Sequence, residues 1–160
     1  MALKNILPAC LAVSVLILDA GEAPAAPRGC FTNAELSAEG IVRYGLRLRE
    51  GARLCSEPPY AFEMMPLWES VDQKVGARFA SSKAQREGAF LREFGKDAHH
   101  RLEMWNARIV FRFRYHPVSE PFCRSVEQMM KDIQTRGWSV FAKQAALSYD
   151  EVRMDFRPCP

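Results

Sequence analysis

Residues 30–55 read CFTNAELSAEGIVRYGLRLREGARLC, and this stretch decides the fold. It opens with a capping-box pattern, because Thr32 is followed three residues later by Glu35, and these two side chains satisfy the free N–H groups at a helix start. Apolar residues then recur at helical spacing: Ile41, Tyr44, Leu48, Ala52 and Cys55. We therefore predict one helix over residues 33–54.

The cysteines at the two ends of this stretch restrict the disulfide pairing. A helix over residues 33–54 is about 33 Å long, so Cys30 and Cys55 lie near opposite ends of it. A disulfide needs Cα atoms within about 7 Å of each other. An unbroken helix therefore excludes a Cys30–Cys55 bridge, and it predicts the crossed pairs Cys30–Cys159 and Cys55–Cys123.

Helix signals continue along the rest of the chain. They are Pro66 at a first turn, a Ser82–Gln85 capping box before an apolar stripe from Leu91 to Ile109, Ser119 before Pro121, and Gly137 before a last apolar period from Trp138 to Val152. The sequence contains no internal repeat and no long linker. We predict a single all-α domain over residues 26–160, a disulfide-stapled bundle of about four to five helices.

An α+β fold is the alternative interpretation. Residues 42–48, 109–115 and 152–156 also alternate between apolar and polar side chains, which is typical of half-buried strands. These three segments would form a small antiparallel sheet. With a turn at Glu50-Gly51, that fold permits the local pairs Cys30–Cys55 and Cys123–Cys159. We favour the all-α fold.

The first 25 residues have the pattern of a cleavable signal peptide. Lys4 precedes a mostly apolar run over residues 6–18, and the small residues of Ala23-Pro24-Ala25 suit a signal peptidase. We expect cleavage after Ala25. The run is shorter than the roughly 20 residues that span a bilayer, so we expect no transmembrane anchor. The predicted location is periplasmic or secreted.

Cysteine content and charge agree with this location. Four cysteines remain after residue 25, none in a Cys-x-x-Cys spacing, which favours two structural disulfides formed in an oxidising compartment. The whole chain carries 22 basic and 19 acidic residues. Residues 1–25 hold one basic and two acidic side chains, so residues 26–160 hold 21 and 17, a net charge of +4. This mild, mixed charge gives no reason to expect a nucleic-acid partner.

The densest basic stretch is the candidate binding surface. Arg101, Arg108 and Arg112 share one face of a helix and are interleaved with aromatic residues. Arginine forks bind carboxylates and phosphates, and arginine and aromatic side chains are enriched at interface centres. The predicted partner is an unknown protein or an anionic ligand of the cell envelope.

A second candidate cluster contains His99, His100 and Glu103. An imidazole and a carboxylate one helical turn apart can bind a metal ion or transfer a proton. The spacing is not that of the zinc peptidases, and only His116 is a further candidate ligand. A solvated helix face, with Asp97 and Arg101 as an ion pair, is the simpler interpretation.

No recognised catalytic motif is present. The sequence has no Gly-rich phosphate loop, no Gly-x-Ser-x-Gly elbow and no haem-attachment site. We therefore expect a non-catalytic binding or interaction protein without a cofactor. The alternatives are a metal-binding or acid–base enzyme that uses the histidine cluster, and a purely structural component of the envelope.

Overall fold

The computed structural model describes residues 29–115 and 117–160, and within these ranges the fold is all-α. The helices are α1 (Asn33–Cys55), α2 (Met64–Phe94), the single 3₁₀ turn η1 (Gly95–Asp97), α3 (Ala98–Arg114), α4 (Glu120–Arg136), α5 (Trp138–Ala146) and α6 (Tyr149–Asp155). The predicted signal peptide, residues 1–25, lies outside the described residues. The predicted all-α bundle is confirmed, with six α-helices in the described part of the chain.

The α+β alternative is wrong. Residues 42–48 lie inside α1, residues 109–115 run to the end of α3, and residues 152–156 lie at the end of α6. In the ranges that the structure describes, β pairing is limited to one isolated bridge between Phe31 and Pro158. The alternating patterns arise because a helix face and a strand face are hard to separate over five to seven residues.

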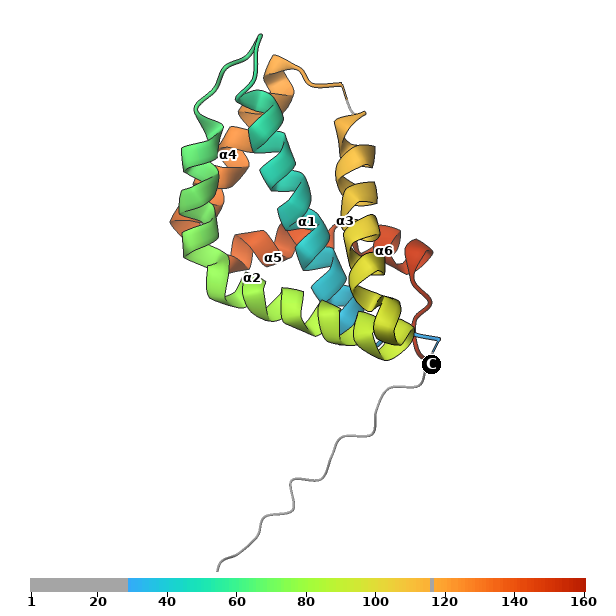
Figure 1. Cartoon of the computed structure of the whole chain (residues 1–160). Coiled ribbons are helices and arrows are strands. Elements are labelled where there is room, and N and C mark those ends of the chain that lie inside the picture. The colour runs from blue at the N-terminus through green and yellow to red at the C-terminus, as the bar shows by residue number, and fades with distance from the viewer. Residues whose placement is uncertain (1–28, 116) are drawn as a thin grey trace, which may run out of the picture.

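Helix α1 is the centre of the bundle, with the other helices around it (Figure 1). Its capping box forms as predicted, since the Glu35 N–H donates to Thr32 Oγ1 at 3.3 Å and the Thr32 N–H donates to Glu35 Oε2 at 2.8 Å. Gly45 allows α2 to approach closely, because a Cβ atom there would lie 2.5 Å from the ring of Phe79. Because other helices cover α1 on several sides, some of its charged side chains are buried, namely those of Glu39, Arg43 and Glu50.

Helix α2 is longer than the sequence indicated. The Ser82–Gln85 pattern does not start a helix, because α2 continues through it and the Ser82 hydroxyl donates instead to the carbonyl of Arg78, one turn earlier. The helix bends partway along (Figure 1), so that its first part lies beside α4 and its second part crosses the ends of α1 and α3.

The break between α2 and α3 falls at Gly95, inside the apolar stripe that the sequence analysis treated as one helix. Gly95 has φ of +55°, a conformation that glycine adopts without steric cost and that ends α2. The predicted stripe is also wrong at its start, since Leu91 is 52% exposed. The following turn, η1, redirects the chain into α3.

The last three helices begin largely where the caps predict. The Ser119 side chain accepts a hydrogen bond from the Phe122 N–H at 3.3 Å, and Pro121 occupies the first turn of α4. Gly137, with φ of +71°, separates α4 from α5. The period from Trp138 to Val152 is not one helix, because Leu147 and Ser148 separate α5 from α6.

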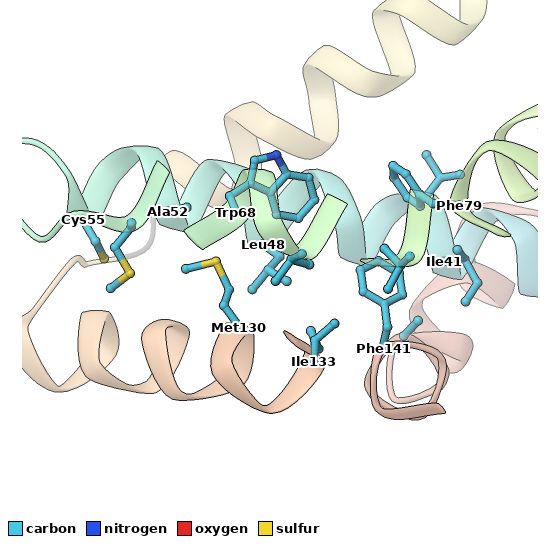
Figure 2. Close-up of a cluster of buried hydrophobic side chains, with 14 of the residues drawn as sticks. Ile41, Leu48, Ala52, Cys55, Trp68, Phe79, Met130, Ile133 and Phe141 are labelled. Carbon is cyan, nitrogen blue, oxygen red and sulfur yellow. The ribbon is translucent and has the colours of Figure 1, made fainter. Parts of the chain in front are cut away.

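The bundle has two buried clusters. The larger one is formed where α1, α2, α4 and α5 face one another, and Figure 2 shows Leu48, Trp68, Met130 and Phe141 pointing into the same space. The smaller cluster lies near the chain ends of the folded part. It consists of Phe31, Leu36, Ala89, Phe90, Ala98, Val152 and Phe156.

Two disulfides fix the ends of α1. They are the crossed pairs predicted with the all-α fold, Cys30–Cys159 with Cα atoms 4.8 Å apart and Cys55–Cys123 with Cα atoms 5.5 Å apart. Beside the first bridge, the Phe31 N–H donates to the Arg157 carbonyl at 2.8 Å, and the Cys159 N–H donates to the Phe31 carbonyl at 2.9 Å. The C-terminal segment is therefore held against the start of α1.

Candidate functional site

A groove of about 1120 Å³ runs along α3. One wall is α3 itself, and the end of α2 closes the groove at the start of α3. The other wall is the C-terminal segment Asp155–Arg157, together with Phe31. Two segments from opposite ends of the sequence thus form one wall, and the Cys30–Cys159 bridge holds them together. We call this hollow the α3 groove.

Aromatic rings form the base of the α3 groove. We call this set the aromatic floor; it consists of Phe31, Phe90, Phe94, Trp105 and Phe156. The ring of Phe156 packs edge-on against Phe31 at 4.7 Å and against Trp105 at 4.9 Å between centroids. These rings belong to the smaller core or pack against it, so the floor is apolar and continuous with that core.

The three predicted arginines all line the α3 groove. Arg101, Arg108 and Arg112 project from α3 on the side that faces the C-terminal segment. They occur at intervals of seven and four residues, which place them in one row along a helix. We call them the arginine row. Their binding role stays a prediction.

Two members of the arginine row have no acidic partner. The guanidinium of Arg101 lies 4.7 Å from the ring centroid of Phe94, and that of Arg108 lies 5.3 Å from the ring of Trp105. Among the described carboxylates, none lies within 4 Å of either guanidinium, so the expected Asp97–Arg101 pair does not form. Arg112 has only a distant pair, 4.0 Å from Asp155. These charges remain available to an anion.

A second row on α3 was missed by the sequence analysis. Met104, Phe111 and Tyr115 line the same groove and are 59%, 55% and 86% exposed. They repeat the intervals of the arginine row three residues later, and this repetition was the signal available in the sequence. We call them the apolar row. Large apolar side chains gathered at one concave surface mark a binding site.

The C-terminal wall is anchored by a buried ion-pair network. Arg43, 1% exposed, lies 3.3 Å from a Glu39 oxygen, 3.2 Å from a Glu151 oxygen and 2.9 Å from an Asp155 oxygen. Glu39 also accepts a 2.9 Å hydrogen bond from the indole N–H of Trp105. The network therefore fixes the C-terminal wall through Asp155 and the floor through Trp105.

A second arginine balances the buried charge. Arg86 Nε lies 2.8 Å from Glu39 Oε2, an ion pair in which the N–H is not aligned for a hydrogen bond. Burial lowers the pKa of the Arg86 guanidinium, and the neighbouring Glu39 opposes this effect. The two arginines and two carboxylates of Glu39, Arg43, Arg86 and Asp155 give no net charge, as a buried cluster requires.

The acid stability of the protein is expected to depend on Glu151. Hydrogen bonds from Arg47 lower the pKa of the Glu151 carboxyl below its usual value of 4.5, and the charges of Arg47 and Arg43 add to this effect. A lowered folded-state pKa gives stability that is present above pH 4.5 and is lost as the pH falls through the folded value. Glu151→Gln should therefore lose less stability than the wild type as the pH falls below about 5.

Urea unfolding midpoints across this pH range measure the effect. Arg47→Gln should show the same flattened acid limb, because it removes the group that lowers the Glu151 pKa. Parallel curves for the wild type and both variants would contradict the assignment.

The predicted histidine cluster is divided between two hollows. His99 and Glu103 line a second groove of about 670 Å³ between α1, α2 and α3, whereas His100 lines the α3 groove. His99 Nε2 lies 3.9 Å from a Glu87 oxygen. Within residues 29–115 and 117–160, no three His, Cys, Asp or Glu residues are grouped closely enough to hold a metal ion. His116 lies outside these residues.

Comparison with protein-family models, curated proteins and solved structures finds no match for this chain. Among the described helices, none is both long and apolar enough to cross a membrane. The fold and the site define a class: a small all-α protein with two intramolecular disulfides and an arginine-lined, aromatic groove.

Proposed function

We propose that the protein is an exported, non-catalytic binding protein that holds an anionic ligand in the α3 groove. The observation that carries this proposal is the pair Arg101 and Arg108, whose guanidinium groups line a concave site and have no acidic partner among the residues that the structure describes. An arginine that faces an apolar groove and lacks a carboxylate partner is suited to donate a charge-assisted hydrogen bond to an incoming anion.

Other arginines near the site differ from Arg101 and Arg108 because they are paired with carboxylates. Arg43 is committed to Glu39, Glu151 and Asp155, and Arg114 lies 2.6 Å from Glu50. Their charges are neutralised within the protein. A ligand carboxylate or phosphate therefore gains most from the unneutralised charges of the arginine row.

Export is part of the proposal. Both disulfides are intramolecular and link distant parts of the chain, which is compatible with an oxidising compartment such as the periplasm or the extracellular medium. The signal-like pattern over residues 1–25 points to the same destination.

Titration with the anionic fluorescent dye anilinonaphthalene sulfonate tests the proposal. We expect the wild type to bind the dye, and Arg101→Gln/Arg108→Gln to bind it at least about tenfold more weakly, because the loss of one charge-assisted hydrogen bond to the sulfonate removes roughly 1.5 kcal/mol or more. Arg78→Gln/Arg153→Gln is the matched control. It removes the same charge from two exposed arginines outside the groove, one of which also lies over a ring, that of Trp138.

Equal loss of dye binding in the groove variant and in the control would mean that net charge alone attracts the dye. No dye binding by the wild type would likewise overturn the proposed site.

A further inference from the structure

We infer that the ligand of the α3 groove is a single-chain anionic amphiphile, with one carboxylate or phosphate head group on an alkyl chain. This inference rests on the proposed function and specifies its ligand. It draws on four features of the groove: the distribution of positive charge along it, the position of its acidic residues, the placement of its apolar surface, and its volume and walls.

The positive charge defines one head-group position. Arg108 and Arg112 are four residues apart, so their Cα atoms are separated by about 6 Å along the α3 axis. Two long arginine side chains at this separation reach the same carboxylate or phosphate. Arg101 lies a further 10 Å or so along the axis, with its guanidinium over the ring of Phe94. One head group therefore contacts Arg108 and Arg112 but does not reach Arg101.

The acidic residues of the groove select against a ligand with several negative charges. Asp97 lines the groove at the start of α3, and Asp155 lines it opposite Arg112. A partner with carboxylates along its whole length, such as an acidic helix, would meet a like charge at Asp97, whereas the charge of Asp155 is already neutralised by Arg43. A single anionic head group at Arg108 and Arg112 lies about 16 Å or more from Asp97 along the axis of α3 and avoids this repulsion.

The apolar surface accommodates an alkyl chain on either side of the head group. Towards the start of α3 lie Met104, Phe94 and the rest of the aromatic floor, and towards its end lie Phe111 and Tyr115. The aliphatic stem of Arg101 adds apolar contact next to Phe94. The side chains on the floor side are the better buried, so the chain lies along the floor and Arg101 covers it.

The volume and the two walls of the groove favour a small molecule over a membrane surface. Its volume of about 1120 Å³ is similar to that of small-molecule pockets, which hold about 300–1000 Å³. The aromatic floor lies between α3 and the C-terminal wall, and a flat bilayer surface does not reach into a hollow between two walls. A free amphiphile enters it end-on or lengthwise.

Competition against the bound dye tests the inference. The probes are laurate below its micelle concentration, dodecanol as the neutral chain, inorganic phosphate as the chainless anion, and a synthetic acidic amphipathic helical peptide. We expect laurate to displace the dye at a concentration at least about tenfold lower than the other three probes, because it alone satisfies both the apolar floor and one head-group position.

Single variants locate the head group and the chain. We expect Arg108→Gln to weaken laurate binding about tenfold and Arg101→Gln about twofold or less, since the head group contacts Arg108 and does not reach Arg101. Phe94→Ala should weaken laurate without changing the affinity for phosphate. Arg78→Gln is the control for a lost charge outside the groove.

The outcomes separate the two proposals. Displacement by phosphate or by the acidic peptide, but not by laurate, would overturn the amphiphile and leave anion binding in place. Displacement by dodecanol as effective as that by laurate would also overturn it, because the head-group contacts would then contribute nothing. Failure of the wild type to bind the dye overturns the proposed function itself.

Discussion

Replacing Arg43 by methionine is expected to lower the free energy of unfolding by about 3–5 kcal/mol. Methionine fills a similar space but removes the charge shared by Glu39, Glu151 and Asp155. Glu39 is buried and keeps Arg86 as a partner, whereas Asp155 keeps only the distant Arg112. Removing one partner of a buried ionic cluster lowers the free energy of unfolding by more than the intact cluster contributes to it, because an uncompensated charge stays buried.

Urea unfolding at neutral pH measures this loss, and Arg47→Met is the matched control. Arg47 is also on α1 and also binds Glu151, but its side chain is partly exposed, so its removal should cost about 1 kcal/mol or less. A loss for Arg43→Met no larger than that for Arg47→Met would contradict the role of Arg43 as the centre of the network.

Removing the Cys30–Cys159 bridge by a double alanine substitution is expected to cost about 2–5 kcal/mol. The bridge closes a loop with a sequence separation of 129 residues, which is long enough to restrict the unfolded chain strongly. It also joins Phe31 to the segment that contains Phe156, so its loss should loosen one wall of the α3 groove. We therefore expect weaker dye binding together with the lower stability.

Two measurements check this second prediction: the urea midpoint and the affinity for the dye. Met154→Ala, at an exposed position of α6, is the control and should leave both unchanged. Unfolding of the double alanine variant at the wild-type midpoint would mean that the backbone hydrogen bonds beside the bridge hold the C-terminal segment without it.

The central helix was predictable from local rules, and its length narrowed the choice of disulfide pairing. The Thr32–Glu35 capping box specifies where α1 begins, and the apolar spacing carries it to Cys55. Once that helix is assumed, its length alone excludes a Cys30–Cys55 bridge. Two pairings then remain, and the crossed one follows only if the first and last segments of the fold are taken to run antiparallel, which is a tertiary assumption.

The boundaries of the later helices depended on features that the sequence shows ambiguously. Ser82 and Gln85 match a capping box, yet the backbone there already has hydrogen-bond partners inside α2, and the serine hydroxyl turns back to Arg78. Gly95 ends the helix because it takes a positive φ, whereas Gly76 and Gly88 lie within α2. The presence of a glycine in the sequence does not predict whether its φ will be positive or negative.

Of the candidate site, the sequence predicted only the row of arginines. The spacing of Arg101, Arg108 and Arg112 places them together on one helix face, and all three line the α3 groove. The opposite wall comes from Phe31 and Phe156, which are far apart in the chain. That wall depends on the disulfide, the ion-pair network and the packing of the smaller core, and these are tertiary features without a local signature.

The bond between Cys30 and Cys159 also has a mechanical consequence. It joins the two ends of the folded chain, with the backbone of Phe31 paired to the same segment. A pulling force applied at these ends is carried across the covalent bond and does not reach the helices between them. While the bond is intact, the protein behaves under tension as a short, inextensible link, and only a reductant converts it into a chain that can be drawn out.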